Sequence, residues 1–325
     1  MRRRSTATVV SAIVTVAVPN RKAVARCLAA DVAAAEAVRA LRCEGVRSVL
    51  LKGPAVARAL YGPAEVRAYA DADLLVAPVD ERRAADVLSR LGYSPLVEDA
   101  ALKGHRPLHA REWVRPDAAS IDLHRTLAGA EAPPERVFAE ISQHTQPVAV
   151  AGEEVEGLDA AALALELALH VAHHGAEAGK AAEDLRRGVT RLATDDWEDA
   201  ARIARRIDAL GALAAGLRAI PEGQPLAVRL CPDARLPVHV ALHAAGAPPL
   251  AAGIDWLGQT PGAIAKGALL ARTFVPAPGA LRLWRPLARR GRTGLVAAYA
   301  TQPFWLAAHA VPSWLAVRRV RREAT

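Results

Sequence analysis

The sequence contains few cysteine, methionine and aromatic residues. Its 325 residues include 3 cysteines and 1 methionine, and only 4% of them are aromatic. The cysteines, Cys27, Cys43 and Cys231, are far apart, odd in number and without Cys-x-x-Cys or Cys/His spacing. This excludes a disulfide framework and a cysteine-based zinc site, and it favours a reducing, cytoplasmic location.

Apolar residues make up 52% of the chain, which is enough for one large domain or two smaller ones. Because aromatics are scarce and alanine is abundant, we expect a core of Ala, Leu and Val. Runs such as AAALALELALHVAHH favour helix, since Ala and Leu have the highest helix propensities. No internal repeat and no low-complexity linker is visible in the sequence.

The net charge of +8 is concentrated near the C-terminus. Residues 281–325 contain nine arginines and one acidic residue, so the rest of the chain is close to neutral. A uniformly basic face is not indicated, and we expect no specific nucleic-acid partner. Trp305 and Trp314 stand near these arginines, a composition that suits weak contact of residues 281–325 with an anionic membrane surface.

Two segments raise the question of a membrane anchor. Residues 1–20 have a basic start and an apolar stretch of signal-peptide length, but no small-x-small cleavage site follows. A first strand, or a disordered leader, is therefore favoured over a signal peptide. Between Arg292 and Arg318 lie 25 residues without Lys, Arg, Asp or Glu. Prolines interrupt this run and basic residues flank both ends, so we expect a buried or interfacial helix pair rather than a membrane span.

Apolar spacing predicts alternating helices and strands in the first half of the chain. Helices are expected at residues 22–44, 55–62 and 81–92. Strands are expected at 46–51 and 66–77 and, as a hairpin around a Pro-Asp turn, at 110–115 and 119–125.

From Leu158 to residue 219 the pattern is helical almost throughout, and residues 222–325 are harder to assign. We therefore predict four parts: a leader or disordered segment at 1–20, an α+β domain at 21–150, a helical domain at 151–222, and a helical, proline-rich, basic C-terminal region at 223–325.

Two aspartates stand one residue apart at the start of an apolar run, in YADADLLVA (69–77). In a strand, residues i and i+2 point to the same face, so Asp71 and Asp73 project together. Like charges this close raise each other's pKa unless a cation neutralises them, and Mg²⁺ takes carboxylate oxygens in this way. The pair alone is a weak signal, because Asp-x-Asp occurs by chance and an aspartate often caps a turn.

A third aspartate lies in a similar setting. Asp122, in SIDLH (120–124), stands between Ile121 and Leu123 in a second predicted strand. If this strand lies beside the first, three carboxylates converge, as a two-metal phosphoryl-transfer site requires. His124 shares the face of Asp122 and is expected to line the same site.

The stretch LLKG (50–53), followed by a helical pattern, predicts a strand-to-helix turn. Gly53 allows the backbone to approach a ligand, and the start of the next helix offers free N–H groups to a phosphate. Lys52 would add a positive charge for the β- or γ-phosphate of a nucleotide, although a solvated surface lysine is the alternative. Pro54 removes one backbone donor from that helix.

His170, His173 and His174 have the i, i+3, i+4 spacing of one helix face. This spacing can hold a metal, but no HExxH glutamate accompanies it. A packed or substrate-facing set of histidines at a cleft is therefore favoured over catalytic zinc. Asp184 is a further candidate for this cleft, although a surface salt bridge is the simpler interpretation.

Five features follow one another along the chain: LLKGPAVARALYG, Arg67, DADLLV, a helix ending in LGY, and IDLH. In this order they resemble the pattern of the uncharacterised nucleotidyltransferase family of the polymerase-β-like superfamily. The resemblance covers residues 35–130 well and continues weakly into the helical region. It implies an α+β fold, with a small mixed sheet and helices, followed by a mainly α-helical C-terminal part. The domain at 21–150 would be the nucleotidyltransferase-like one.

The resemblance also implies a metal-dependent reaction. A nucleoside monophosphate would pass from an NTP such as ATP to an acceptor hydroxyl or amine, with pyrophosphate leaving. Three carboxylates would be catalytic and hold Mg²⁺ or Mn²⁺, namely Asp71, Asp73 and Asp122. The nucleotide would meet Lys52 and Gly53 in place of the usual Gly-Ser turn, with Arg67 near the phosphates or the sheet edge and His124 lining the site.

No motif specifies the acceptor, which could be a small molecule or a peptide, or the preferred base. The sequence departs from the family pattern at Ala72, where Ile is common, and at Pro54, which weakens the expected phosphate contact. Two hypotheses follow. The first is a Mg²⁺-dependent nucleotidyltransferase, and the second is a catalytically degenerate NTP-binding or protein-interaction module, associated with a membrane surface through its basic tail.

Overall fold

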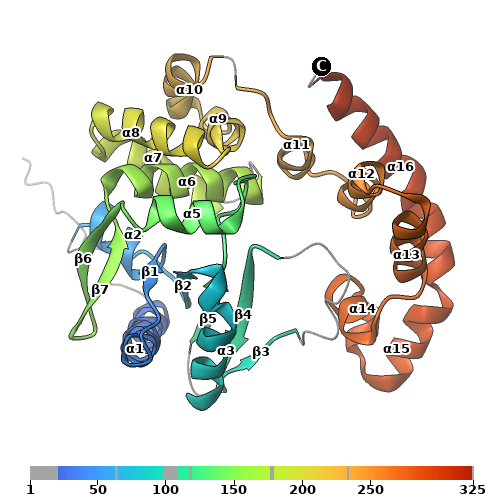
Figure 1. Cartoon of the computed structure of the whole chain (residues 1–325), viewed down its shortest axis with the longest axis horizontal. Helices are drawn as coiled ribbons and strands as arrows, with labels where there is room; N and C mark the ends of the chain where they lie inside the picture. The colour runs from blue at the N-terminus through green and yellow to red at the C-terminus, as the bar shows by residue number, and fades with distance from the viewer. Residues whose placement is uncertain are drawn as a thin grey trace, which may run out of the picture.

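The computed structural model describes residues 21–62, 65–97, 108–116, 119–175, 179–232 and 234–323. Its centre is a seven-stranded mixed sheet in the order β3-β4-β5-β2-β1-β7-β6 (Figure 1). The strands are β1 (Ser48–Leu50), β2 (Asp71–Val76), β3 (Ser94–Pro95), β4 (Ala110–Val114), β5 (Ser120–His124), β6 (Thr145–Val150) and β7 (Glu153–Leu158).

The middle of the sheet combines both strand directions. β2 runs antiparallel to β1 and parallel to β5, and β1 is also parallel to β7. The hairpin expected around the Pro-Asp turn is confirmed as antiparallel β4 and β5. Because side chains alternate between the faces of a strand, the aspartates of β2 and β5 occupy one face and their apolar neighbours the other.

Helices α1 (Arg21–Cys43) and α3 (Glu81–Arg90) cover the apolar face. They pack onto residues such as Leu50, Leu74 and Ile121, all of which are fully buried. The side of α1 that meets the sheet is mostly alanine, and small side chains allow a helix backbone to approach a sheet closely. The helices predicted over these ranges are thus confirmed.

A helical layer covers the opposite face of the sheet (Figure 1). Its central helix is α6 (Ala160–His174), which is buried along most of its length and contacts α7, α8 and α9. Asp159 begins α6 by accepting a hydrogen bond from the backbone N–H of Ala162, as a helix N-cap does. The layer also contains α5 (Pro134–Ile141), α7 (Gly179–Arg191), α8 (Thr194–Arg206), α9 (Leu210–Arg218) and α10 (Gln224–Leu230).

The remaining helices form an arc beside this body (Figure 1). Val240 joins the core of the helical layer, and the described residues of these helices also form two small clusters of buried apolar side chains. None of the helices in the described ranges is long and apolar enough to cross a membrane. These helices are α11 (Val238–Ala244), α12 (Ala251–Gln259), α13 (Ala263–Phe274), α14 (Pro278–Trp284), α15 (Gly291–Ala300) and α16 (Gln302–Glu323).

The α+β class and the helical C-terminal part expected from the sequence are confirmed. The β6–β7 hairpin was not expected, and it extends the sheet beyond residue 150. The four-part division of the chain stays a prediction. The expected leader at 1–20 lies outside the described residues.

The contact of α9 with α6 generates the first prediction. A Cβ placed on Gly216 would overlap the backbone carbonyl oxygen of Ala168, which cannot move without disturbing α6. We expect Gly216→Ala to lower the free energy of unfolding by about 3 kcal/mol through overpacking. Gly267→Ala is the matched control, because nothing lies within 4 Å of that position and alanine favours helix by ~1 kcal/mol. Equal effects in urea denaturation would contradict this packing.

Candidate functional site

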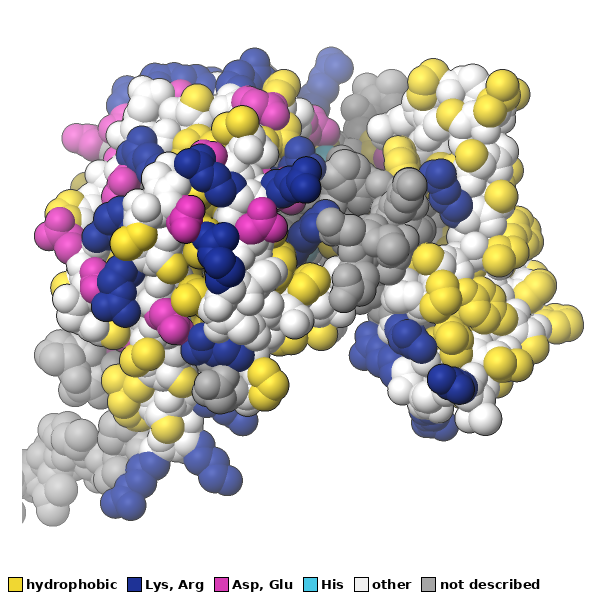
Figure 2. Space-filling model, turned by 60° about the horizontal axis from the view of Figure 1, so that its bottom comes forward, with side chains coloured by type: hydrophobic (Ala, Val, Ile, Leu, Met, Phe, Trp, Pro, Cys, Tyr) yellow, Lys and Arg dark blue, Asp and Glu magenta, His cyan; other side chains and the backbone are white. Residues whose placement is uncertain are grey.

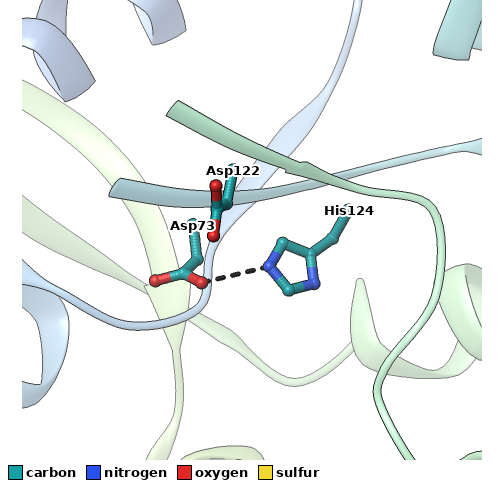
Figure 3. Close-up of side chains that lie close together, drawn as sticks. All are labelled: Asp73, Asp122 and His124. Carbon is teal, nitrogen blue, oxygen red and sulfur yellow. Dashed lines mark hydrogen bonds and ion pairs between the residues drawn. The ribbon is translucent and has the colours of Figure 1, made fainter. Parts of the chain in front are cut away.

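The parallel pairing of β2 and β5 places two carboxylates side by side. Asp73 is paired in register with Asp122, and Asp71 with Ser120. In a parallel pair, residues in register point to the same face, so the carboxylates of Asp73 and Asp122 are neighbours (Figure 3). The convergence expected from the sequence therefore occurs for this pair.

His124 completes a cluster with these two aspartates. Its Nε2 lies 3.1 Å from Oδ1 of Asp73, and its ring turns back from β5 toward β2 (Figure 3). Ligand atoms of Asp73, Asp122 and His124 all lie within 4.8 Å of one another, as required of residues that share one metal ion. Two carboxylates and one imidazole form a donor set that a divalent cation can accept.

Asp71 lies on the same face but outside this cluster. Two residues along a strand span ~6.6 Å, so the carboxylate of Asp71 is displaced toward the start of β2. It lines the same cleft, and its charge acts on Asp122. The structure thus groups His124, rather than Asp71, with the other two aspartates.

Lys52 is buried next to the cluster. Its Nζ lies 2.9 Å from Oδ1 of Asp73 and 3.2 Å from Oε1 of Glu166, which comes from α6. The alternative of a solvated surface lysine is therefore wrong, because the side chain of Lys52 is only 13% exposed. The ammonium joins the sheet to the helical layer through one carboxylate on each side.

Burial and charge set opposite protonation tendencies for the two paired aspartates. Burial alone would raise the pKa of Asp73, but Lys52 and His124 outweigh it and hold that pKa well below its usual range. For Asp122, burial and the negative charge of Asp73 outweigh the opposing effect of His124 and raise its pKa to about 6. Neighbouring carboxylates with such divergent pKa values are typical of functional sites.

Gly53 and Arg67 shape the turn that follows β1. Gly53 has a φ of 60°, and a Cβ there would lie 2.9 Å from the carbonyl oxygen of Asp71. Nη1 of Arg67 donates a hydrogen bond to the carbonyl oxygen of Gly53 at 3.3 Å. The next helix, α2 (Pro54–Leu60), begins with the proline that removes one donor.

Arg67 is held by Asp184 rather than left free for phosphate. Its Nη2 and Nε donate to the Asp184 carboxylate at 2.7 and 2.9 Å, and both side chains are almost fully buried. The hydroxyl of Tyr61 donates to Asp184 at 2.7 Å. The interpretation of Asp184 as a surface salt-bridge residue is therefore wrong, since it anchors α7 to the turn at Gly53.

These residues line a cleft of about 600 Å³ between the sheet and the helical layer. Histidines form much of its wall, with ring centroids 4.8 Å apart for His109 and His173 and 4.5 Å apart for His170 and His174. Burial lowers the pKa of His109 to about 3 and also lowers that of His170, so both rings are neutral at neutral pH.

Sequence reasoning missed two acidic residues of this cleft. Glu166 is hidden in the apolar run of α6, and its Oε2 is buried without a hydrogen-bond partner among the described residues. Glu112 is paired in register with Asp122 across β4 and β5. Its position in the hairpin opposite SIDLH was the only signal available, because strand register cannot be read from spacing alone.

The carboxylates of the site can bind a divalent cation, and the histidines on the other side of the cleft can form hydrogen bonds with polar groups of a ligand.

The chain is similar in sequence to one family of known proteins. A family model described as an uncharacterised nucleotidyltransferase matches residues 17–222, more than half of the chain. No curated protein sequence matches the chain.

Two solved structures resemble the chain at low similarity. One is the solution structure of the antibiotic-resistance factor ANT(2'')-Ia, at 16% identity and a TM-score of 0.39, covering 55% of this chain and 94% of that one. The other is the crystal structure of an antigenic nucleotidyltransferase-like protein from Paracoccidioides brasiliensis, at 13% identity and a TM-score of 0.34, covering 56% of this chain and 92% of that one.

The Arg67–Asp184 pair generates the second prediction. Asp184→Asn leaves the buried guanidinium of Arg67 without its counter-ion, so we expect the free energy of unfolding to fall by ~3–5 kcal/mol. The matched control is Glu44→Gln, which breaks the exposed pair with Arg90 and should cost less than ~1 kcal/mol. Similar losses for both variants in urea denaturation would refute a buried pair.

The raised pKa of Asp122 generates the third prediction. An unfolded aspartate titrates near pH 4, so between about pH 4 and 6 the folded protein holds a proton that the unfolded chain has lost. This contribution to stability is therefore present at low pH and lost as the pH rises to about 6. We expect Asp122→Asn to be more stable than the wild type at pH 7, by up to ~3 kcal/mol, and to lose this advantage near pH 4.

The measurement is urea denaturation in the presence of a chelator at both pH values. Asp195→Asn, at an exposed position on α8, is the control and should show no such dependence. A constant difference between Asp122→Asn and the wild type across the pH range would contradict the raised pKa.

Proposed function

The chain belongs to the uncharacterised nucleotidyltransferase family, and from this premise we propose that it moves a nucleoside monophosphate from an NTP to an acceptor bound in the cleft beneath α6. One observation carries the proposal: Asp73 and Asp122 are in register on adjacent parallel strands, with His124 beside them. Side chains placed in this way on adjacent strands can share a cation, and that cation can bind the triphosphate.

The donor set fits a divalent metal ion. Asp73, Asp122 and His124 would hold it, with Asp71 further along β2 facing the same cleft. Carboxylates suit Mg²⁺ and Mn²⁺ alike, and an imidazole ligand moves the preference toward Mn²⁺. When bound, such an ion supplies charge neutralisation for the phosphates and lowers the pKa of an attacking hydroxyl.

Lys52 is assigned to positioning rather than to direct phosphate binding. Its ammonium is shared by Asp73 and Glu166 and keeps the Asp73 carboxylate ionised, which a ligand of a cation must be. Burial opposes the charge of Lys52, but the two carboxylates outweigh it and raise its pKa. Arg67, paired with Asp184, is likewise assigned to holding the turn at Gly53.

The acceptor side of the cleft is assigned to Glu166 and the neutral histidines. Oε2 of Glu166 is buried and unpartnered within the described part of the chain, so it is available to accept a hydrogen bond from an acceptor hydroxyl or amine. Neutral His109 and His170 can donate or accept without adding charge. An acceptor with several hydroxyl or amino groups would match this lining, and the cytoplasmic location stays a prediction.

The second candidate is a degenerate module that binds an NTP without turnover. The observation in its favour is Pro54, which occupies the first turn of the seven-residue α2 and leaves one backbone donor fewer beside Gly53. Binding and turnover therefore have to be measured separately.

The fourth prediction tests the proposed site by thermal shift with each of the four NTPs, with and without Mg²⁺ or Mn²⁺. A ligand at about 100 times its Kd adds ~2.7 kcal/mol of stability, and we expect this gain to require both NTP and metal. Asp73→Asn and Asp122→Asn should abolish it, because each removes a negatively charged ligand. Glu198→Gln, an exposed position on α8, should leave it unchanged.

Pyrophosphate release in the presence of polyhydroxyl or polyamine acceptors distinguishes the two candidates. Release that depends on Asp73 and Asp122 supports the enzyme, whereas metal-dependent NTP binding without release supports the degenerate module. If no NTP and metal combination stabilises the wild type, the proposed site is wrong.

A further inference from the structure

The charge of the chain is divided more sharply than its total suggests. Residues 256–322 contain 11 Lys and Arg side chains and no Asp or Glu. The rest of the chain holds the other 31 basic residues and all 34 acidic ones. The segment that forms α13–α16 is therefore strongly positive, and the body that carries the cleft is slightly negative.

Helix α13 is apolar and yet buries none of its residues. Ile264 is 90% exposed, and Phe274 at its end is 52% exposed. A helix with this composition normally packs its apolar side against another element, because burial provides most helical stability in proteins. The described structure offers α13 only limited contact with α16, so the apolar surface of α13 lacks a covering partner.

Helix α16 has the same character along its outer side. Phe304, Ala308, Val311 and Leu315 follow one another at helical spacing, and each of them is exposed. The opposite side packs against α11 and α12 through residues such as Val317. The helix is therefore fixed to the protein by one side and presents an apolar stripe on the other, which ends in exposed arginines.

Exposed apolar side chains elsewhere are scattered and mostly aliphatic. In the described chain, every exposed large aromatic side chain lies in α13–α16, namely Phe274, Trp284, Phe304 and Trp314. Figure 2 shows hydrophobic side chains gathered over these helices, with Lys and Arg side chains along the edge of the patch. Contiguous apolar patches of this kind mark interaction surfaces.

A second cleft lies between α12, α13 and α16. It measures about 620 Å³ and has a mixed lining, with apolar side chains such as Leu257 and Leu270 and four cationic residues: Lys266, Arg318, Arg321 and Arg322. Arg321 is fixed by Asp255 at 2.8 Å, and the guanidinium of Arg318 lies 5.2 Å from the ring centroid of Trp314. Cations beside an apolar slot match an acidic headgroup and its acyl chain.

We propose that α13–α16 dock onto an anionic bilayer surface. Exposed aromatics and aliphatics enter the headgroup region, while the flanking arginines meet acidic lipids. A nucleic acid matches the charge of this surface but not its apolar side chains. A second copy matches the apolar side chains but brings the same uncompensated positive charge to the contact. None of the residues that form this surface lines the cleft of the proposed catalytic residues, so the proposal does not depend on the proposed function.

The fifth prediction concerns binding of the full-length protein to vesicles. We expect co-sedimentation with phosphatidylcholine vesicles that contain phosphatidylglycerol, little with phosphatidylcholine alone, and weakening by salt. Each arginine removed should lower partition about five-fold, which is ~1 kcal/mol per basic residue. The triple variant Arg318→Gln, Arg319→Gln and Arg322→Gln should therefore bind on the order of 100-fold more weakly.

Matched variants distinguish vesicle binding through this surface from nonspecific hydrophobic adsorption. Ile264→Ser with Phe304→Ser should weaken binding, whereas Val79→Ser with Val228→Ser, equally exposed on the body, should not. Trp284 and Trp314 are about half exposed, so lipids carrying a quencher should reduce tryptophan fluorescence in the wild type. All of these variants change exposed side chains and should keep the wild-type Tm.

Four outcomes would overturn the proposal. The first is equal binding to vesicles with and without acidic lipid. The second is binding that none of the α13–α16 variants changes. The third is a dimer by light scattering that Ile264→Ser with Phe304→Ser converts to monomer while vesicle binding is absent, which would assign the surface to self-association. The fourth is RNA binding that persists in the same apolar variants while vesicle binding is absent, which would assign the surface to a nucleic acid.

Discussion

The pairing of Asp73 with Asp122 is the constraint on which the rest of the site depends. Two carboxylates in register on parallel strands, beneath a helical layer, repel each other and resist burial. Lys52 neutralises one of them, Asp73, whose carboxylate is also in contact with the ring of His124, and Glu166 in turn balances Lys52. These contacts run from β5 across β2 to α6. The charged side chains that balance the paired carboxylates therefore also hold α6 against the sheet.

The other wall of the cleft is held in the same manner. Arg67 joins the carbonyl oxygen of Gly53 to Asp184 of α7, with Tyr61 as a further donor. Apolar packing covers most of the interface between the layers, yet at the cleft the layers meet through buried ions. Replacing such ions by apolar residues is often neutral or stabilising, so stability alone does not account for them. Their geometry holds the turn and the carboxylates in position around an open cleft.

The sequence predicted the parts of this site that depend on local periodicity. Asp71, Asp73, Asp122 and His124 could be placed on strand faces because side chains alternate with a period of two. The ion pairs Lys52–Glu166 and Arg67–Asp184 could not be predicted, since the two partners of each pair lie more than a hundred residues apart. Glu166 was hidden by the apolar run around it, and the choice of His124 over Asp71 depends on strand register. Local pattern thus identifies candidate residues, whereas tertiary contacts decide which of them meet.

The division of charge also gives the proposed membrane contact a direction. Electrostatic attraction to acidic lipids fades within a Debye length, ~8–10 Å at physiological salt, so only residues near the bilayer contribute. The C-terminal helices carry the positive charge and the exposed aromatics, whereas the body has a small excess of acids and only scattered exposed apolar side chains. An anionic bilayer attracts α13–α16 and weakly repels the body. The chain is therefore oriented with α13–α16 facing the lipid and the body facing away from it. Vesicle binding therefore does not require the carboxylates of β2 and β5 to contact the bilayer.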